Sequence, residues 1–112
     1  VTKEGYPYRG AVDAPVTIVE FSDYNCSVCR NFNVTTARIV DDELVATGQV
    51  RYVVHPFVLY PESAPIVEAA ACAQEQEGFW SFHHQVFVDG NRFSRSTPPS
   101  QALLCEWAQA SD

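Results

Sequence analysis

Two cysteines stand three positions apart in the stretch FSDYNCSVCR, where Cys26 and Cys29 enclose a serine and a valine. A cysteine at the start of a helix lies near unpaired backbone N–H groups, which stabilise a thiolate. The second cysteine, one turn later on the same face, is close enough to form a disulfide with the first. The spacing indicates an exchangeable dithiol, with Cys26 as the exposed nucleophile and Cys29 as the more buried resolving thiol.

A carboxylate, Glu20, precedes the cysteine pair in a run of β-branched and apolar residues. We expect this run to be a strand that ends near the base of the helix, where a carboxylate can take the proton of Cys29 during exchange. Cys26, Cys29 and Glu20 are therefore the candidate catalytic residues. No positive charge lies between the two sulfurs, which favours a moderate rather than an extreme oxidant.

Two other interpretations of the cysteine pair remain open. A structural zinc site needs four ligands, and the chain has no second closely spaced pair, so cysteines and histidines would have to converge from distant segments. A purely structural bridge would close a loop too short to stabilise the fold much. The sequence favours redox chemistry over both, and we expect no metal and no cofactor.

The other two cysteines, Cys72 and Cys105, are isolated in the sequence. Cys72 is placed on the apolar side of an alanine-rich helix and Cys105 on the last helix. In an oxidising compartment the two can pair and close a loop of about 34 residues, which would stabilise the fold by roughly 3 to 4 kcal/mol. The alternative is two buried free thiols. We predict the structural disulfide.

The hydrophobic pattern predicts the elements that position these residues. Residues 15–21 are predicted to form a strand covered on both faces, because their apolar residues are nearly continuous. A helix follows over 27–46, with a kink expected around Thr35, and a second strand over 49–57. Strand, helix and strand in this order predict a βαβ unit with parallel strands.

Three more helices are predicted after the second strand. They cover residues 64–78, 79–90 and 101–110, and Ser100 is expected to cap the last one. Two strands cannot cover this many helices, so the sheet must be completed from elsewhere. Either the N-terminal arm, residues 1–15, supplies strands, or another chain does, or the C-terminal part of the fold is missing.

Composition excludes several classes of function. Fourteen acidic against seven basic side chains give a net charge of −7, and no cluster of lysines or arginines occurs. Nucleic acid and anionic membrane surfaces are therefore disfavoured as partners.

The stretches DAPVTIVEFSDYNCSVCRNF and VRYVVHPFVLYPESAPIVEAAACAQEQEGFWSFHHQVF resemble the DsbA-like branch of the thioredoxin superfamily, from about residue 12 to residue 88. The resemblance implies an α/β, thioredoxin-like fold with an inserted helical segment. It makes Cys26 the attacking cysteine, Cys29 the resolving cysteine and Glu20 the acidic residue of the preceding strand. It also gives Phe79, Trp80 and His83 a packing role.

One departure from the family pattern concerns the C-terminal half. Members continue into a cis-proline loop that faces the cysteines, followed by two strands and a helix, whereas the last prolines here precede a helix. We therefore expect residues 1–112 to form a single, incomplete domain. It would consist of a βαβ part over 12–57, which carries the cysteine pair, and a helical insert over 62–112.

The resemblance implies an extracytoplasmic thiol:disulfide oxidoreductase, in the periplasm or outside the cell envelope of a bacterium. Its partners would be substrate proteins with free thiols and a redox partner that reoxidises the dithiol. The alternative is a non-catalytic thioredoxin-like module that binds a partner or takes part in assembly. Unpaired sheet edges further predict a homo-oligomer.

Overall fold

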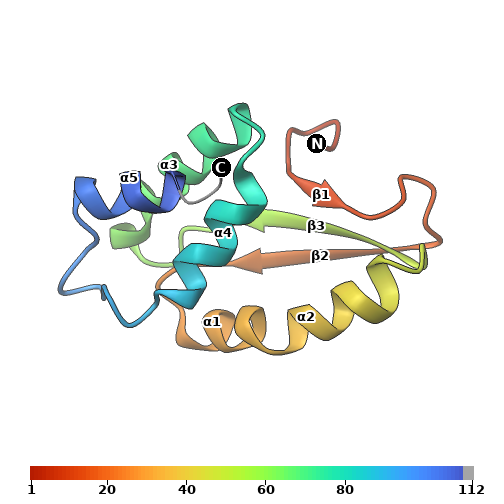
Figure 1. The fold of residues 1–112 in the computed structure, drawn as a ribbon, viewed down its shortest axis with the longest axis horizontal. Helices are drawn as coiled ribbons and strands as arrows, with labels where there is room; N and C mark the ends of the chain where they lie inside the picture. Colours follow the sequence, from red (N-terminus) through yellow and green to blue (C-terminus); the bar gives the residue numbers. More distant parts are fainter. Residues whose placement is uncertain (110–112) are drawn as a thin grey trace.

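The computed structural model describes residues 1–109. Three strands, β1 (Tyr8–Arg9), β2 (Val16–Ser22) and β3 (Val50–Pro56), form one sheet in the order β1-β3-β2 (Figure 1). The helical segments are α1 (Ser27–Val34), α2 (Thr36–Val40), the π-helical turn η1 (Asp41–Val45), the 3₁₀ turn η2 (Pro61–Ser63), α3 (Ala64–Glu75), α4 (Phe79–Val88) and α5 (Gln101–Gln109).

The predicted βαβ unit is confirmed. Strands β2 and β3 are parallel, and their register places Glu20 beside Val54 and Ile18 beside Tyr52. Strand β1 pairs antiparallel with the other side of β3. The N-terminal arm therefore supplies the third strand of the sheet, which is one of the three ways in which the sequence allows the sheet to be completed. Three strands are about the smallest sheet that is independently stable.

The helix after β2 breaks where a kink was expected. Thr35 leaves the helical region (φ −124°, ψ −78°), and its hydroxyl donates to the Asn31 carbonyl at 2.6 Å. Such side-chain bonds compete with the backbone ladder of a helix and bend it. Helix α2 and turn η1 follow and end at Val45, and Gly48 then has a φ of +81°, which suits a glycine.

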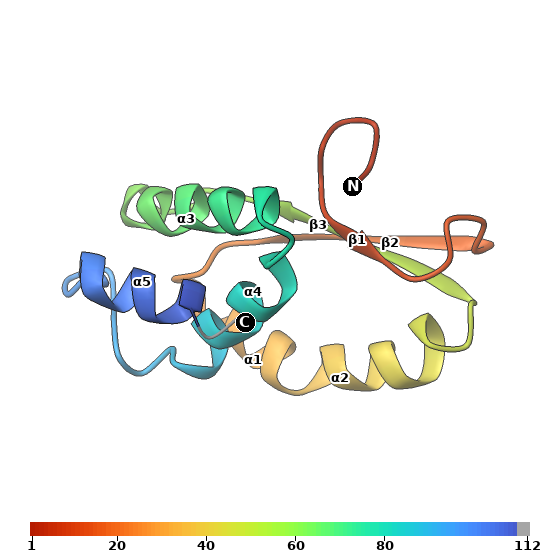
Figure 2. The same cartoon turned by 45° about the horizontal axis from the view of Figure 1, so that its top comes forward.

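The two faces of the sheet differ, which corrects the prediction that the first strand is covered on both sides. Ile18, Glu20 and Ser22 point toward the helices, whereas the alternate residues Val19 and Phe21 are 46% and 62% exposed. Helices α1 and α2 lie on one side of the sheet, and the N-terminal arm lies on the other (Figure 2). The nearly continuous apolar run reflects a face that residues 1–109 leave open.

The helices after β3 complete the core. Helix α4 buries five residues at helical spacing, as its sequence predicts: Phe79, Phe82, His83, Val86 and Phe87. Trp107 of α5 is fully buried, and the Ser100 hydroxyl accepts a hydrogen bond from the backbone N–H of Leu103 at 3.1 Å, so the predicted cap is confirmed. The last residue predicted for this helix, Ala110, lies outside the described residues.

Candidate active site

The structure places the cysteine pair at the junction between β2 and α1. Cys26 is the N-cap residue of α1, with an extended backbone (φ −85°, ψ 118°). Its Sγ accepts a hydrogen bond from the backbone N–H of Cys29 at 3.3 Å. All four cysteines are free, so the structure describes the reduced dithiol. A sulfur in this position receives an N–H group that an uncapped helix would leave unpaired.

The second sulfur has a different environment. Cys29 is half-buried and packs against the core, whereas Val28, between the two cysteines, is 76% exposed. Burial first, then the hydrogen bond with Cys26 and the negative charge of Glu20, raise the pKa of the Cys29 thiol from 9.0 to about 11. Cys29 therefore keeps its proton at neutral pH.

Glu20 lies in β2 at the centre of a polar group that we call the Glu20 cluster: Glu20, Ser22, Asn33, Tyr52 and His83. Its Oε2 accepts hydrogen bonds from the Ser22 hydroxyl at 2.6 Å and from the Asn33 amide at 3.3 Å. Its Oε1 accepts one from the Tyr52 hydroxyl. The Asn33 amide also donates to the Cys29 carbonyl at 2.9 Å, so a single side chain links the carboxylate to the resolving cysteine.

The histidine of the cluster is fully packed. His83 is 5% exposed, its Nδ1 lies 2.9 Å from the Tyr24 hydroxyl, and its Nε2 lies 3.8 Å from Glu20 Oε2. Burial first, and then the charges of Arg9 and His84, lower the pKa of His83 from 6.5 to about 3. The imidazole is therefore neutral at neutral pH.

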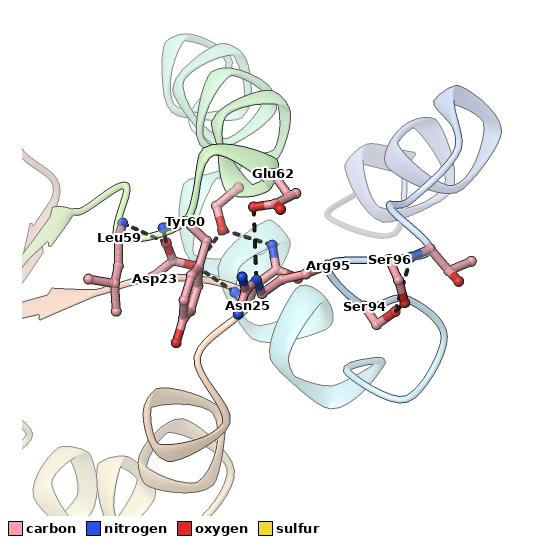
Figure 3. Close-up of polar contacts among 10 residues, drawn as sticks. Asp23, Asn25, Leu59, Tyr60, Glu62, Ser94, Arg95 and Ser96 are labelled. Atoms are coloured by element: carbon pink, nitrogen blue, oxygen red, sulfur yellow. Dashed lines mark hydrogen bonds and ion pairs between the residues drawn. The ribbon is translucent and has the colours of Figure 1, made fainter.

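A buried carboxylate, Asp23, fixes the loop that leads into α1. It is 1% exposed, and Figure 3 shows it between that loop and the loop after β3. Its Oδ1 accepts from the backbone N–H of Asn25 at 2.7 Å and from the Ser63 hydroxyl. Its Oδ2 accepts from the N–H groups of Leu59 and Tyr60 at 2.8 and 3.0 Å. The Asp23 carbonyl further accepts from the N–H of Cys26 at 3.1 Å.

The second loop is held in turn by a segment that follows α4. The Arg95 guanidinium lies 4.0 Å from the centre of the Tyr60 ring and 3.9 Å from the Glu62 carboxylate, as Figure 3 shows. Cation–π contacts of this kind contribute modestly at exposed sites. They connect the helical part of the chain to the loop that Asp23 anchors.

The three predicted catalytic residues are thus brought into one region, and the other two cysteines are not. Cys72 and Cys105 line a different cavity of about 490 Å³ between α3 and α5. Both thiols are exposed, which corrects the placement of Cys72 on an apolar helix face and the alternative of two buried thiols. Their pairing stays a prediction.

Sequence reasoning missed Asp23, Tyr24, Asn33 and Tyr52. The residue types of Ser22 to Asn25 are typical of a turn, but an aspartate three residues before a helix N-cap is also a strong hydrogen-bond acceptor. A tyrosine within a buried strand is a comparable signal, because its hydroxyl needs a partner.

Neither a metal-binding cluster nor a membrane-spanning helix occurs within residues 1–109. In this part of the chain, no three histidine, cysteine, aspartate or glutamate side chains gather so that they could hold a metal ion. None of its helices is both long and apolar enough to cross a membrane.

Comparison with known proteins identifies the family. A family model described as thioredoxin matches residues 2–104. The chain belongs to the thioredoxin family. Probable disulfide bond formation protein D of Bacillus anthracis is 32% identical over 98 residues, which are 85% of this chain and 45% of that protein.

Two solved structures share this thioredoxin-like fold. Oxidised BdbD from Bacillus subtilis has a TM-score of 0.81 at 26% identity, over 98% of this chain and 60% of that one. Wolbachia pipientis α-DsbA1 has a TM-score of 0.84 at 20% identity, over 99% and 56%. The resemblance to the DsbA-like branch is confirmed, and the chain spans less than half of the curated relative and under two thirds of both structures.

Proposed function

We propose that this chain is the cysteine-bearing part of an extracytoplasmic thiol:disulfide oxidoreductase, which passes a Cys26–Cys29 disulfide to the thiols of substrate proteins. The observation that carries the proposal is the position of Cys26 as the N-cap of α1, with its Sγ accepting the N–H of Cys29. The matched relatives named for disulfide bond formation support it. Disulfides persist in oxidising compartments, which supports a location outside the cytoplasm.

The exchange proceeds in two steps. A substrate thiolate attacks Cys26 Sγ, the bond between Cys26 and Cys29 breaks, and Cys29 leaves as a thiolate that takes a proton. A second substrate thiolate then attacks the substrate sulfur of the mixed disulfide and releases the Cys26 thiolate. The substrate loses two electrons and the protein gains them, so a redox partner must reoxidise the dithiol.

Glu20 is proposed to move the proton in the first step. Its carboxylate is joined to the backbone of Cys29 through Asn33, and the raised pKa of Cys29 favours the thiol as the product form. A buried carboxylate that alternately gives and accepts this proton acts as a general acid and base.

The test is oxidation of a reduced dithiol peptide by the preoxidised chain. We expect stoichiometric formation of the peptide disulfide, and loss of this activity in Cys26→Ser. The double variant Cys72→Ser/Cys105→Ser is the matched control and keeps the activity, because it leaves the Cys26–Cys29 pair intact. A Cys26→Ser chain that still oxidises the peptide would contradict the proposal.

A second function, a non-catalytic module that binds a partner, is favoured by the exposed apolar residues of β2: Val16, Val19 and Phe21. The same assay on this chain and on a longer form of the same gene product separates the two. Activity only in the longer form supports the oxidoreductase. Two inert forms support the binding module.

A further inference from the structure

The proposed exchange uses one member of the Glu20 cluster and leaves His83 without a role. His83 comes from α4, 63 positions beyond Glu20 in the sequence, and its Nε2 is buried with no hydrogen-bond partner. Buried polar atoms of this kind are rare and call for an explanation. The carboxylate of Glu20 lies beside it, with Oε2 3.8 Å from Nε2.

The surroundings of His83 permit either neutral form of its ring. In a neutral imidazole one nitrogen carries a proton and the other accepts a hydrogen bond. The Tyr24 hydroxyl, 2.9 Å from Nδ1, can donate to a bare nitrogen or accept from a protonated one. Nε2 can therefore carry a proton or lack one, depending on the group that it faces.

That group changes its charge when it exchanges a proton. An ionised Glu20 favours the form with the proton on Nε2, because the N–H then points toward a carboxylate. A protonated Glu20 favours a bare Nε2, which accepts from the carboxyl O–H. His83 also lines a cavity of about 440 Å³ that Asn33 of the Glu20 cluster lines as well.

We propose that His83 is a positioning residue whose tautomer follows the protonation state of Glu20, so that its buried Nε2 faces a complementary group in both states. The link to exchange at Cys29 rests on the proposed function, whereas the pair of Glu20 and His83 rests on the contacts alone. The titratable groups around the pair come from five elements and one loop: Arg9, Tyr24, Cys29, Asp41, Tyr52 and His84.

The tautomer is measured by long-range ¹H–¹⁵N correlation spectra of the reduced chain labelled in histidine, from pH 3.5 to pH 9. The Glu20 carboxyl carbon is followed in the same titration. We expect His83 to change from one neutral form to the other with the midpoint of Glu20. His84→Gln assigns the resonances and keeps this change, because His84 is an exposed neighbour on the same helix.

In Glu20→Gln the change is lost, and His83 keeps a single form at every pH. A wild-type His83 that holds one tautomer on both sides of the Glu20 midpoint would overturn the proposal. So would a tautomer change that survives in Glu20→Gln. Peptide oxidation is measured separately on this chain and on the longer form of the gene product. If the chain shows the coupled change but neither form oxidises the peptide, the proposed function is contradicted and this inference stands.

Discussion

Cys26 and Cys29 have different roles in the proposed exchange because their surroundings differ. Cys26 receives a backbone N–H from α1, whereas Cys29 packs against the core and lies near a carboxylate. In the proposed exchange, a substrate thiolate therefore attacks the Cys26 sulfur and displaces Cys29. Since the Cys29 thiol keeps its proton, the reduced form has a single competent nucleophile at neutral pH.

Alkylation of the reduced chain at pH 7 tests this division. A pKa of about 11 leaves Cys29 with roughly 100-fold less thiolate than an ordinary cysteine. We expect iodoacetamide to modify Cys26 first and Cys29 at least tenfold more slowly than the exposed Cys105, as counted by peptide mass spectrometry. Equal rates at Cys26 and Cys29 would contradict the assignment.

His83 makes the free energy of unfolding depend on pH. Its pKa is lowered from 6.5 to about 3 in the folded chain, so its contribution to the free energy of unfolding is complete above pH 6.5 and is lost as pH falls toward 3. Between pH 7 and pH 4 this amounts to about 3 kcal/mol. Between pH 7 and pH 4, the free energy of unfolding of His83→Gln, measured in urea, should therefore fall by about 3 kcal/mol less than that of wild type. The exposed His84→Gln should match wild type.

The loops before α1 and after β3 act as one unit because Asp23 joins them. Four donors converge on its carboxylate, and three of them are backbone N–H groups. An unpaired buried donor costs about 1 to 3 kcal/mol. The position of Cys26 thus depends on the contacts of Asp23 with residues that lie 36 to 40 positions beyond Asp23 in the sequence.

Substitution of Asp23 tests this dependence. Asp23→Ala leaves the partly buried N–H groups of Asn25, Leu59 and Tyr60 without their acceptor, so we expect the free energy of unfolding to fall by about 3 kcal/mol, or about 1 kcal/mol for each donor. The matched control is Asp13→Ala, an exposed aspartate ahead of β2, which should change it by less than 0.5 kcal/mol. Equal stability of the two variants in urea would contradict the argument.

Helices α3 and α5 carry the predicted second disulfide. Cys72 and Cys105 line the same cavity, so a bridge would fasten the last helix to the rest of the fold. We expect the chain prepared under oxidising conditions, and alkylated without reductant, to show no modification at either residue by mass spectrometry. Two alkylated thiols would rule out the bridge.

At the scale of single elements, the sequence predicts the features that depend on residues close together in the chain. The helical period of Phe79, Phe82 and Val86 and the kink at Thr35 are properties of a single segment, and both are confirmed. The contacts of Tyr24 with His83 and of Tyr52 with Glu20 join residues 59 and 32 positions apart. No periodicity contains such pairs, because they arise only when separate elements pack together.

The molecule as a whole has one well-covered sheet face and one open face. Within residues 1–109 the outer edge of β2 has no partner strand, and on the open face its side chains Val19 and Phe21 are 46% and 62% exposed. An exposed apolar edge strand is a template for pairing with another chain. The same surface therefore bears on both the binding alternative and the predicted oligomer.

Self-association of the chain should therefore depend on β2. We expect light scattering to show a mass above that of a monomer, which increases with concentration, because edge strands pair through their free backbone groups. Val19→Lys should restore the monomer by placing a charge on the open face. Val12→Lys introduces the same charge at a residue that is 70% exposed but outside the sheet, and it should leave association unchanged. A wild-type chain that stays a monodisperse monomer at every concentration would contradict the predicted association.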